Sequence, residues 1–313
     1  MQPKRTRIEL VDVARGVALV AMAIYHFTWD LDFFGYIAPN TSVTGGWKIF
    51  ARLIASSFLF LVGVSLFLAH RERFRLRPFL KRLAVIAAAA ATITVVTYFV
   101  TPEGFIFFGI LHHITLASVL GALALRLPIP IILALAVFAI AAPHIVQAPF
   151  LDQPVFWWMG LSSNVRPSND YIPLFPWFGA VLLGLAAAKA SARAGLIERL
   201  GNLRPTRKVP LLAAAGRHSL VFYLLHQPVL FSLVWLFALM MPPTPDPAQF
   251  LQACTGECAT RNEEPFCRAY CACVLEEASA AGRLGALYSR QADDETQAWL
   301  EDVVFRCSME NYE

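Results

Sequence analysis

"LVDVARGVALVAMAIYHFTWDLDFFGY", residues 10–36, is an apolar stretch interrupted by ionisable side chains. It is long enough to cross a membrane, because a spanning helix needs about 20 predominantly apolar residues. Asp12, Arg15, His26 and Asp30 nevertheless lie within it. Ionisable groups are costly at membrane depth, and those that occur there usually belong to a site or a pathway. The stretch therefore predicts a membrane-spanning helix with a chemical role.

The whole chain has the composition of a polytopic membrane protein. Of its 313 residues, 57% are hydrophobic and 15% are charged, and the mean hydropathy is +0.55. A soluble domain has about 25% charged residues. Seven apolar blocks are long enough, or nearly long enough, to span a membrane: residues 8–30, 47–69, 79–101, 105–126, 128–147, 173–191 and 214–241. We predict an all-α polytopic membrane protein with about seven transmembrane helices and a small, helical, Cys-rich C-terminal tail.

The distribution of lysine and arginine predicts the orientation of these helices. Basic residues are concentrated before the first block and in residues 71–82 and 189–208, whereas the opposite loops contain only Lys48 and Arg166. Loops rich in Lys and Arg remain on the cytoplasmic side of a membrane. We therefore expect a multi-pass protein in the lipid bilayer of the inner (cytoplasmic) membrane, with a cytoplasmic N-terminus and an extracytoplasmic tail.

The sign of the charge changes after residue 241. Residues 1–241 contain 21 Lys and Arg against 9 Asp and Glu, a net charge of +12, whereas residues 242–313 contain 5 against 13, a net charge of −8. The proline-rich segment MPPTPDP, residues 241–247, makes a stiff connection between them. We expect residues 1–241 to form a transmembrane domain. Residues 242–313 would form an acidic extracytoplasmic cap, through which the chain could bind a periplasmic partner or a second copy.

All six cysteines lie in this tail, spaced as CxxxC, eight residues, CxxxCxC and a distant sixth cysteine. Two cysteines four residues apart lie on one face of a helix, so two such pairs can face each other in a helical hairpin. Of the 15 connectivities that six cysteines allow, an antiparallel hairpin predicts Cys254–Cys271, Cys258–Cys267 and Cys273–Cys307. A zinc site with four thiolate ligands is the alternative. The expected oxidising compartment and the absence of histidine from the tail favour disulfides.

A stripe of ionisable residues, Asp12, Arg15, His26 and Asp30, lies on one face of the first predicted helix. Asp12 and Arg15 are one turn apart, His26 follows Arg15 by eleven residues, or about 16 Å of helix, and Asp30 is one turn further. Such a stripe can face protein or water while the other faces of the helix meet lipid. In the simpler interpretation, Asp12 and Arg15 form an ion pair and His26 is a packing residue.

Other predicted helices also bring polar or aromatic side chains to the outer half of the membrane. Arg52 enters the second block from outside, His112 and His113 lie about two turns into the fourth, Trp177 opens the sixth, and His226 is near the middle of the seventh. We interpret this pattern as a polar, partly hydrated cavity that opens outward.

Three chemistries suit a cavity with these residues. Histidine can act as a general base or acyl carrier in acyl transfer, because imidazole titrates near neutral pH. Histidine and aspartate can form the proton relay of a transporter. Paired histidines on facing helices can bind haem, but the adjacent His112 and His113 point to different faces, and the chain has no CxxCH motif.

Five segments carry a resemblance to a known family: RIELVDVARGVALVAMAIYHF (7–27), ASSFLFLVGVSLFLAH (55–70), GILHHITLAS (109–118), DYIPLFPWFGAVLLG (170–184) and GRHSLVFYLLHQP (216–228). Over about residues 7–240, the chain resembles the bacterial relatives of heparan-α-glucosaminide N-acetyltransferase. That enzyme moves acetyl from acetyl-CoA to the amino group of a terminal glucosamine across a membrane. The tail lies outside the resemblance.

The Arg-Gly pair of the first block, with a histidine eleven residues after the arginine, also resembles membrane O-acyltransferases that modify bacterial surface glycans. In those enzymes the matching Arg and His are functional, which implies roles for Arg15 and His26. The human-type enzyme has its proposed active histidine in the lumenal loop after the first span, and this chain has no histidine between residues 27 and 69. Transfer through a covalent histidine and direct transfer therefore both stay open.

The resemblance implies that acetyl-CoA is the acyl donor and that an extracytoplasmic glycan amine or hydroxyl is the acceptor. We expect acetyl-CoA to bind from the cytoplasmic side, where Arg15 and the basic loops can meet its phosphates. Arg15, Arg52 and Trp177 are the expected donor-binding residues. The expected catalytic residues are His26, oriented by Asp30, and the assisting His112, His113 and His226. We expect neither a metal ion nor a nucleic-acid partner. The alternative is a transporter, or a polar-cavity membrane protein of the same fold without catalysis.

Overall fold

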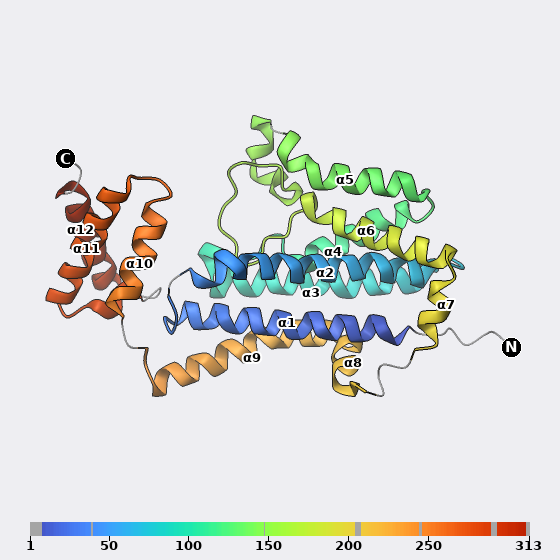
Figure 1. Cartoon of the computed structure of the whole chain (residues 1–313), viewed down its shortest axis with the longest axis horizontal. Coiled ribbons are helices and arrows are strands. Elements are labelled where there is room, and N and C mark those ends of the chain that lie inside the picture. Colours follow the sequence, from blue (N-terminus) through green and yellow to red (C-terminus); the bar gives the residue numbers. More distant parts are fainter. Residues whose placement is uncertain are drawn as a thin grey trace. The chain divides into compact units, whose positions relative to one another are not determined.

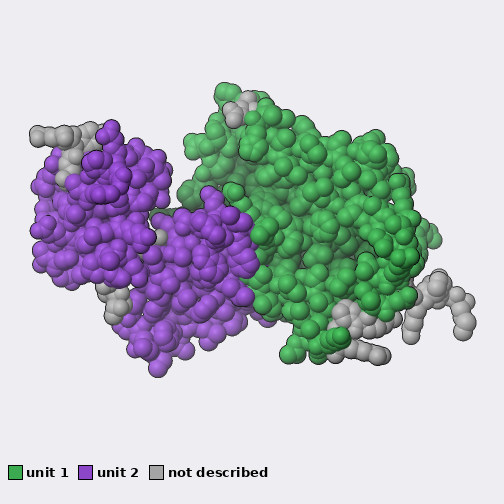
Figure 2. Space-filling view, viewed as in Figure 1, with its two compact units in different colours: residues 1–21, 52–224 green, residues 22–51, 225–313 purple. Residues whose placement is uncertain are grey.

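The computed structural model of the chain describes residues 8–38, 40–146, 148–203, 208–243, 246–288 and 293–310, and these residues form helices and loops without strands. The chain divides into two compact units (Figure 2). Unit 1 contains residues 1–21 and 52–224, and unit 2 contains residues 22–51 and 225–313. Because α1 (Glu9–Phe33) and α9 (Ser219–Met240) each contribute to both units, we describe the two units one at a time.

The apolar blocks of the sequence form the long helices of the structure (Figure 1). Besides α1 and α9, these are α2 (Gly45–His70), α3 (Leu76–Val100), α4 (Ile110–Ala124), α5 (Ile129–Ile145) and α6 (Leu174–Arg193). Five of the seven, α1, α2, α3, α6 and α9, are long and apolar enough to cross a membrane, and α4 and α5 are shorter apolar helices. The prediction of an all-α membrane protein is confirmed.

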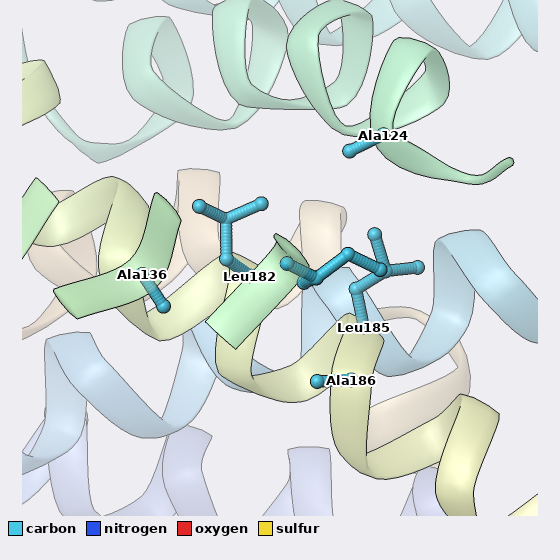
Figure 3. Packing of buried hydrophobic residues seen from close by; sticks show 6 residues of the cluster. Ala124, Ala136, Leu182, Leu185 and Ala186 are labelled. Carbon is cyan, nitrogen blue, oxygen red and sulfur yellow. The ribbon is translucent and has the colours of Figure 1, made fainter. Parts of the chain in front are cut away.

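The core of unit 1 includes a layer in which α4, α5 and α6 pack together (Figure 3). Leu182 and Leu185 of α6 are almost fully buried against Ala136 of α5 and Ala124 of α4. Alanines at these contacts let the helices approach closely, as small residues do in membrane proteins. This packing anchors the shorter helices α4 and α5 on the longer α6.

Glycines bring two pairs of helices in unit 1 into backbone contact. A Cβ atom added at Gly63 of α2 would lie 2.0 Å from the Val181 carbonyl oxygen, and one at Gly184 of α6 would lie 2.0 Å from the Phe60 carbonyl oxygen. Helix α1 meets α8 (Pro210–Arg217) in the same way. There a Cβ at Gly216 would lie 1.8 Å from the Asp12 carbonyl oxygen. No side chain larger than hydrogen fits at these positions without movement of the helices.

The fourth predicted block begins later as a helix than the sequence indicated, and the seventh is divided between two helices. Helix α4 starts at Ile110 rather than at residue 105, because the preceding segment pairs with the loop before α6. The Asn169 and Ile172 amides donate to the Gly104 and Phe108 carbonyl oxygens, at 2.9 and 3.1 Å. The seventh block, predicted from residue 214, is divided between α8 and α9.

Three disulfides fix the helices of the tail in unit 2. Helices α10 (Pro247–Cys258), α11 (Glu264–Ala280) and α12 (Asp294–Glu310) form this region. Their bonds are Cys254–Cys271, Cys258–Cys267 and Cys273–Cys307. The connectivity predicted from cysteine spacing is confirmed. The third bond joins α11 to α12, where Val274 and Val303 form a small core.

Candidate functional site

A cavity of about 490 Å³ lies in unit 1 and combines apolar walls with three cationic side chains. We call it the cationic cavity. Its lining comes from α1, α2, α3, α4 and α9: Arg15, Phe58, Leu61, Val62, Pro78, Lys81, Arg82, Val85, Ile86, Ile110, Leu111, Ile114, Ser219, Leu220 and Tyr223. The volume is within the range of sites for small molecules and cofactors.

Arg15 is held in place by contacts that include Asp12 and Ser65. Its guanidinium lies 3.4 Å from an oxygen of Asp12, which is 3% exposed, and it donates a hydrogen bond to the Ser65 hydroxyl on α2. The ion pair follows from the i, i+3 spacing of Asp12 and Arg15 on α1. A guanidinium has a planar fork of N–H groups, a geometry that matches carboxylate and phosphate. The simpler interpretation of Asp12 and Arg15 as an ion pair is therefore compatible with a binding role for Arg15.

Tyr223 connects the wall of the cavity to a carboxylate that the sequence analysis did not select. Its hydroxyl donates to an oxygen of Asp170 at 3.4 Å, and the Ile110 amide at the start of α4 donates to the same oxygen at 2.9 Å. Burial raises the pKa of Asp170, against the opposing effects of the bonds from Ile110 and Tyr223. The carboxylate satisfies one of the amide donors that a helix N-terminus leaves without a partner.

Asp170 begins the segment DYIPLFPWFGAVLLG (170–184), one of the five that carry the family resemblance. Its clearest sequence signal was an acidic residue just before an apolar block. Gly109 leaves the space for it, since a Cβ there would lie 2.3 Å from the Asp170 carboxylate. Only the pairing of two distant loops reveals this contact, which explains why the sequence pattern did not.

His112 uses both ring nitrogens in local hydrogen bonds. The Gly109 amide donates to Nδ1 at 3.2 Å, so the proton of a neutral ring is on Nε2, which lies 3.1 Å from the Thr94 hydroxyl oxygen of α3. The Thr94 hydroxyl in turn donates to the Ile106 carbonyl oxygen at 2.7 Å. The ring thus caps the start of α4 and joins it to α3.

His113 is fully buried and faces the segment before α6. Its Nδ1 lies 3.2 Å from the Ile172 carbonyl oxygen and 3.1 Å from that of Pro173, so Nδ1 must carry the proton that these acceptors require. Nε2 is buried and has no hydrogen-bond partner among the described residues. The adjacent histidines therefore face different surroundings, as the sequence predicted.

In unit 2, α1 and α9 bring four polar side chains together: His26, Asp30, His226 and Gln227. We call them the His26 cluster. The rings of His26 and His226 are 4.9 Å apart between centroids, and the Gln227 amide donates to Asp30 at 2.7 Å. His26, Asp30 and His226 were predicted as site residues from the sequence, whereas Gln227 was not. Among the described residues, no three His, Cys, Asp or Glu side chains are grouped as metal ligands would be.

The two remaining predicted site residues, Arg52 and Trp177, have different surroundings. Arg52 is exposed on α2. Trp177 packs against apolar residues of α2, α4 and α6. Neither residue is among those that line the cationic cavity in the described structure. The sequence placed both near the outer ends of their helices, but linear position alone does not determine which way a side chain points.

Comparisons with known proteins place these observations in a family. No curated protein and no solved structure matches the chain. A model of the heparan-alpha-glucosaminide N-acetyltransferase catalytic domain matches residues 7–228, which is more than two thirds of the chain. The match covers every residue of the cationic cavity and of the His26 cluster. The chain, with its membrane-spanning helices, therefore belongs to the heparan-alpha-glucosaminide N-acetyltransferase catalytic family.

Proposed function

We propose that the protein is a transmembrane acetyltransferase that takes acetyl from acetyl-CoA and transfers it to an amine or hydroxyl of an extracytoplasmic glycan. Membership of the family supports the reaction class. The observation that carries the choice of donor is the cationic cavity, in which Arg15, Lys81 and Arg82 lie among apolar side chains.

The composition of this cavity matches the chemistry of coenzyme A. Its phosphates are anionic, and arginine binds phosphate through a planar fork of N–H groups. Its pantetheine arm is long and largely apolar, and the aliphatic side chains of α2, α3 and α4 would surround it. Lys81 and Arg82 follow the strongly basic segment 71–77, which the positive-inside rule assigns to the cytoplasm. The donor would therefore enter from the compartment that contains acetyl-CoA.

In the proposed reaction, His26 removes a proton from the attacking nitrogen or oxygen of the acceptor. The new bond forms at the acetyl carbonyl carbon while the bond from carbon to sulfur breaks, and the CoA thiolate then takes up a proton. Transfer through an acetylated histidine would take two steps: a ring nitrogen of His26 attacks the acetyl carbon as the bond from carbon to sulfur breaks, and the acceptor then attacks the same carbon as the bond from carbon to His26 breaks. Asp30 and His226 would assist within the cluster. His112 we assign to structure, because both of its ring nitrogens are engaged.

The test is acetyl-CoA turnover by the purified full-length protein in lipid nanodiscs, with glucosamine as acceptor and CoA thiol release as the readout. Arg15→Ala and Arg82→Ala should each raise the KM for acetyl-CoA, by about five- to a hundredfold for a lost charged hydrogen bond. Arg15→Lys should recover only part of the loss, because a single ammonium cannot make the forked contact.

Arg77→Ala is the matched control, because this basic residue of α3 is outside the lining of the cavity. Its KM for acetyl-CoA should equal that of the wild type. If Arg77→Ala and Arg82→Ala raise the KM for acetyl-CoA equally, the basic residues attract acetyl-CoA only through the overall positive electrostatic potential. Acetyl-CoA binding without any thiol release would favour a protein of this fold that has lost catalysis.

A further inference from the structure

Gln227 is the residue that fixes the orientation of Asp30 in the His26 cluster. Its side-chain nitrogen donates to Asp30 Oδ1 at 2.7 Å, and Asp30 is 0% exposed. The two residues come from α1 and α9, so the bond holds the two helices together as well as the carboxyl group. Asp30 has a defined orientation because the donor is a planar amide with a fixed geometry.

Two oxygens of this pair have no hydrogen-bond partner among the described residues. They are Asp30 Oδ2 and Gln227 Oε1, and both are buried. Buried polar atoms are rarely left without a partner, and each one costs about 1–3 kcal/mol. The two atoms belong to side chains of unit 2 that are hydrogen-bonded to each other.

Both oxygens identify the chemistry of the missing partner. A carboxylate and an amide oxygen accept hydrogen bonds, so the partner must donate them. A packing role would not require these oxygens, since Leu or Met would fill the same volume without a buried polar atom. Nearby, Phe231 already packs against Phe33 and Phe34 and so joins α9 to α1 without polar atoms.

We propose that Asp30 Oδ2 and Gln227 Oε1 together bind an N–H or O–H group of the acceptor sugar, with Gln227 acting as a binding and positioning residue. This inference rests on the proposed function, and it adds the acceptor subsite and its hydrogen-bonding polarity. An ordered water in place of the sugar is the competing interpretation, because water can donate the same two bonds.

The experiment measures acceptor binding in the absence of acetyl-CoA, so that its result does not depend on catalysis. Glucosamine and glucose are titrated against the full-length protein in nanodiscs by calorimetry. Gln227→Leu should weaken binding of the recognised sugar about ten- to a hundredfold, since a buried hydrogen bond is lost. Gln227→Asn keeps the amide and should recover part of the affinity. An amine donor predicts weakening for glucosamine alone, and a hydroxyl donor predicts it for both sugars.

Phe231→Leu is the matched control, since it alters the contact of α9 with α1 one turn away without removing a polar group. It should leave the affinity for sugar unchanged and lower the melting temperature slightly. The proposal is overturned if Gln227→Leu binds both sugars as the wild type does, or if neither sugar binds the wild type, because the oxygens then hold water. Sugar binding without acetyl transfer would instead refute the proposed function alone.

Discussion

Asp12, Arg15, His26 and Asp30 interrupt one helix, and each has a different polar environment. Arg15 bonds to Asp12 and Ser65 and lines the cationic cavity. His26 meets the ring of His226, and Asp30 accepts a hydrogen bond from Gln227. A spanning helix tolerates these groups because protein side chains, on the same helix or on neighbouring ones, face them in place of lipid.

His26 is the residue with the sharpest test. Replacement by Gln keeps a hydrogen-bonding side chain but removes the imidazole ring nitrogen that can accept a proton or an acetyl group. If His26 is the base or the acyl carrier, His26→Gln should fail as badly as His26→Ala, with a loss of about 10²–10⁴-fold in kcat. His70→Gln is the control, since that ring bonds to the Leu66 carbonyl oxygen at the end of α2. Near-normal transfer by His26→Gln would make His26 a packing residue.

Asp170 offers a test that depends on pH. Burial raises its pKa, so Asp170 keeps its proton to a higher pH in the folded protein than in the unfolded chain. The wild type should therefore lose stability as pH rises from the ordinary pKa of an aspartate through the raised pKa. Asp170→Asn stays neutral and keeps an oxygen that can accept from Ile110 and Tyr223. Its melting temperature relative to wild type should therefore be higher at alkaline than at acidic pH. A difference in melting temperature between variant and wild type that does not change with pH would contradict the raised pKa of Asp170.

At the scale of helices, the backbone contacts between α2 and α6 determine how closely unit 1 can pack. Gly63→Ala or Gly184→Ala would place a methyl group against a carbonyl oxygen of the other helix. Overpacking of this kind costs about 1–3 kcal/mol, and more where backbone must move. Thermal unfolding in detergent should show the loss. Gly46→Ala is the control, because a Cβ there meets nothing within 4 Å. An equal loss of stability in Gly46→Ala would show that the clash with the neighbouring helix is not the cause.

Helix positions were largely predictable from sequence, because long apolar blocks give a strong signal. Helix starts were less predictable. Residues 105–109 are apolar and were included in the fourth block, but hydrogen bonds from residues 169 and 172 hold part of the preceding chain outside the helix. The same long-range pairing places Asp170 at the start of α4. Contacts between distant loops leave no periodic pattern, so neither feature could be predicted from the sequence.

The candidate site was predictable in part, for a related reason. The i, i+3 and i, i+4 spacings on α1 identified Arg15, His26 and Asp30, and His226 was found from its position in an apolar helix. Gln227 is adjacent to His226 but was not selected, because an uncharged amide in an apolar helix is a weak signal. Its importance depends on the geometry of α1 and α9 together.

For the whole molecule, the disulfides and the distribution of basic residues make linked predictions. If the tail is exported, alkylation without prior reduction should find none of the six cysteines reactive. Each bond should stabilise the tail by about 2–4 kcal/mol, so reduction should unfold it at lower temperature or denaturant concentration. Six reactive thiols together with bound zinc in the purified protein would show that the tail binds metal instead.

The orientation itself can be measured with fusions. A reporter that is active only outside the cytoplasm should be active when fused after residue 241 and inactive when fused after residue 72. The reason is the excess of Lys and Arg in the loops assigned to the cytoplasm. A cytoplasmic result after residue 241 would mean that one helix does not cross the membrane. Helix α5 would be the first candidate, because Pro143 and His144 interrupt its end.

The close helix contacts at four glycines limit the mutations that the gene can tolerate. These residues are Gly16, Gly63, Gly184 and Gly216. A glycine codon begins with two guanines, and every single-base change that replaces glycine introduces a residue with a Cβ atom. At these four positions, a Cβ would lie within about 2 Å of a carbonyl oxygen on a neighbouring helix. Every missense mutation that a single base change produces at these codons should therefore destabilise the packing of the helices. A library of random point mutants should lose variants at these four codons while it retains them at Gly46 and Gly256, where the space beside the backbone is open.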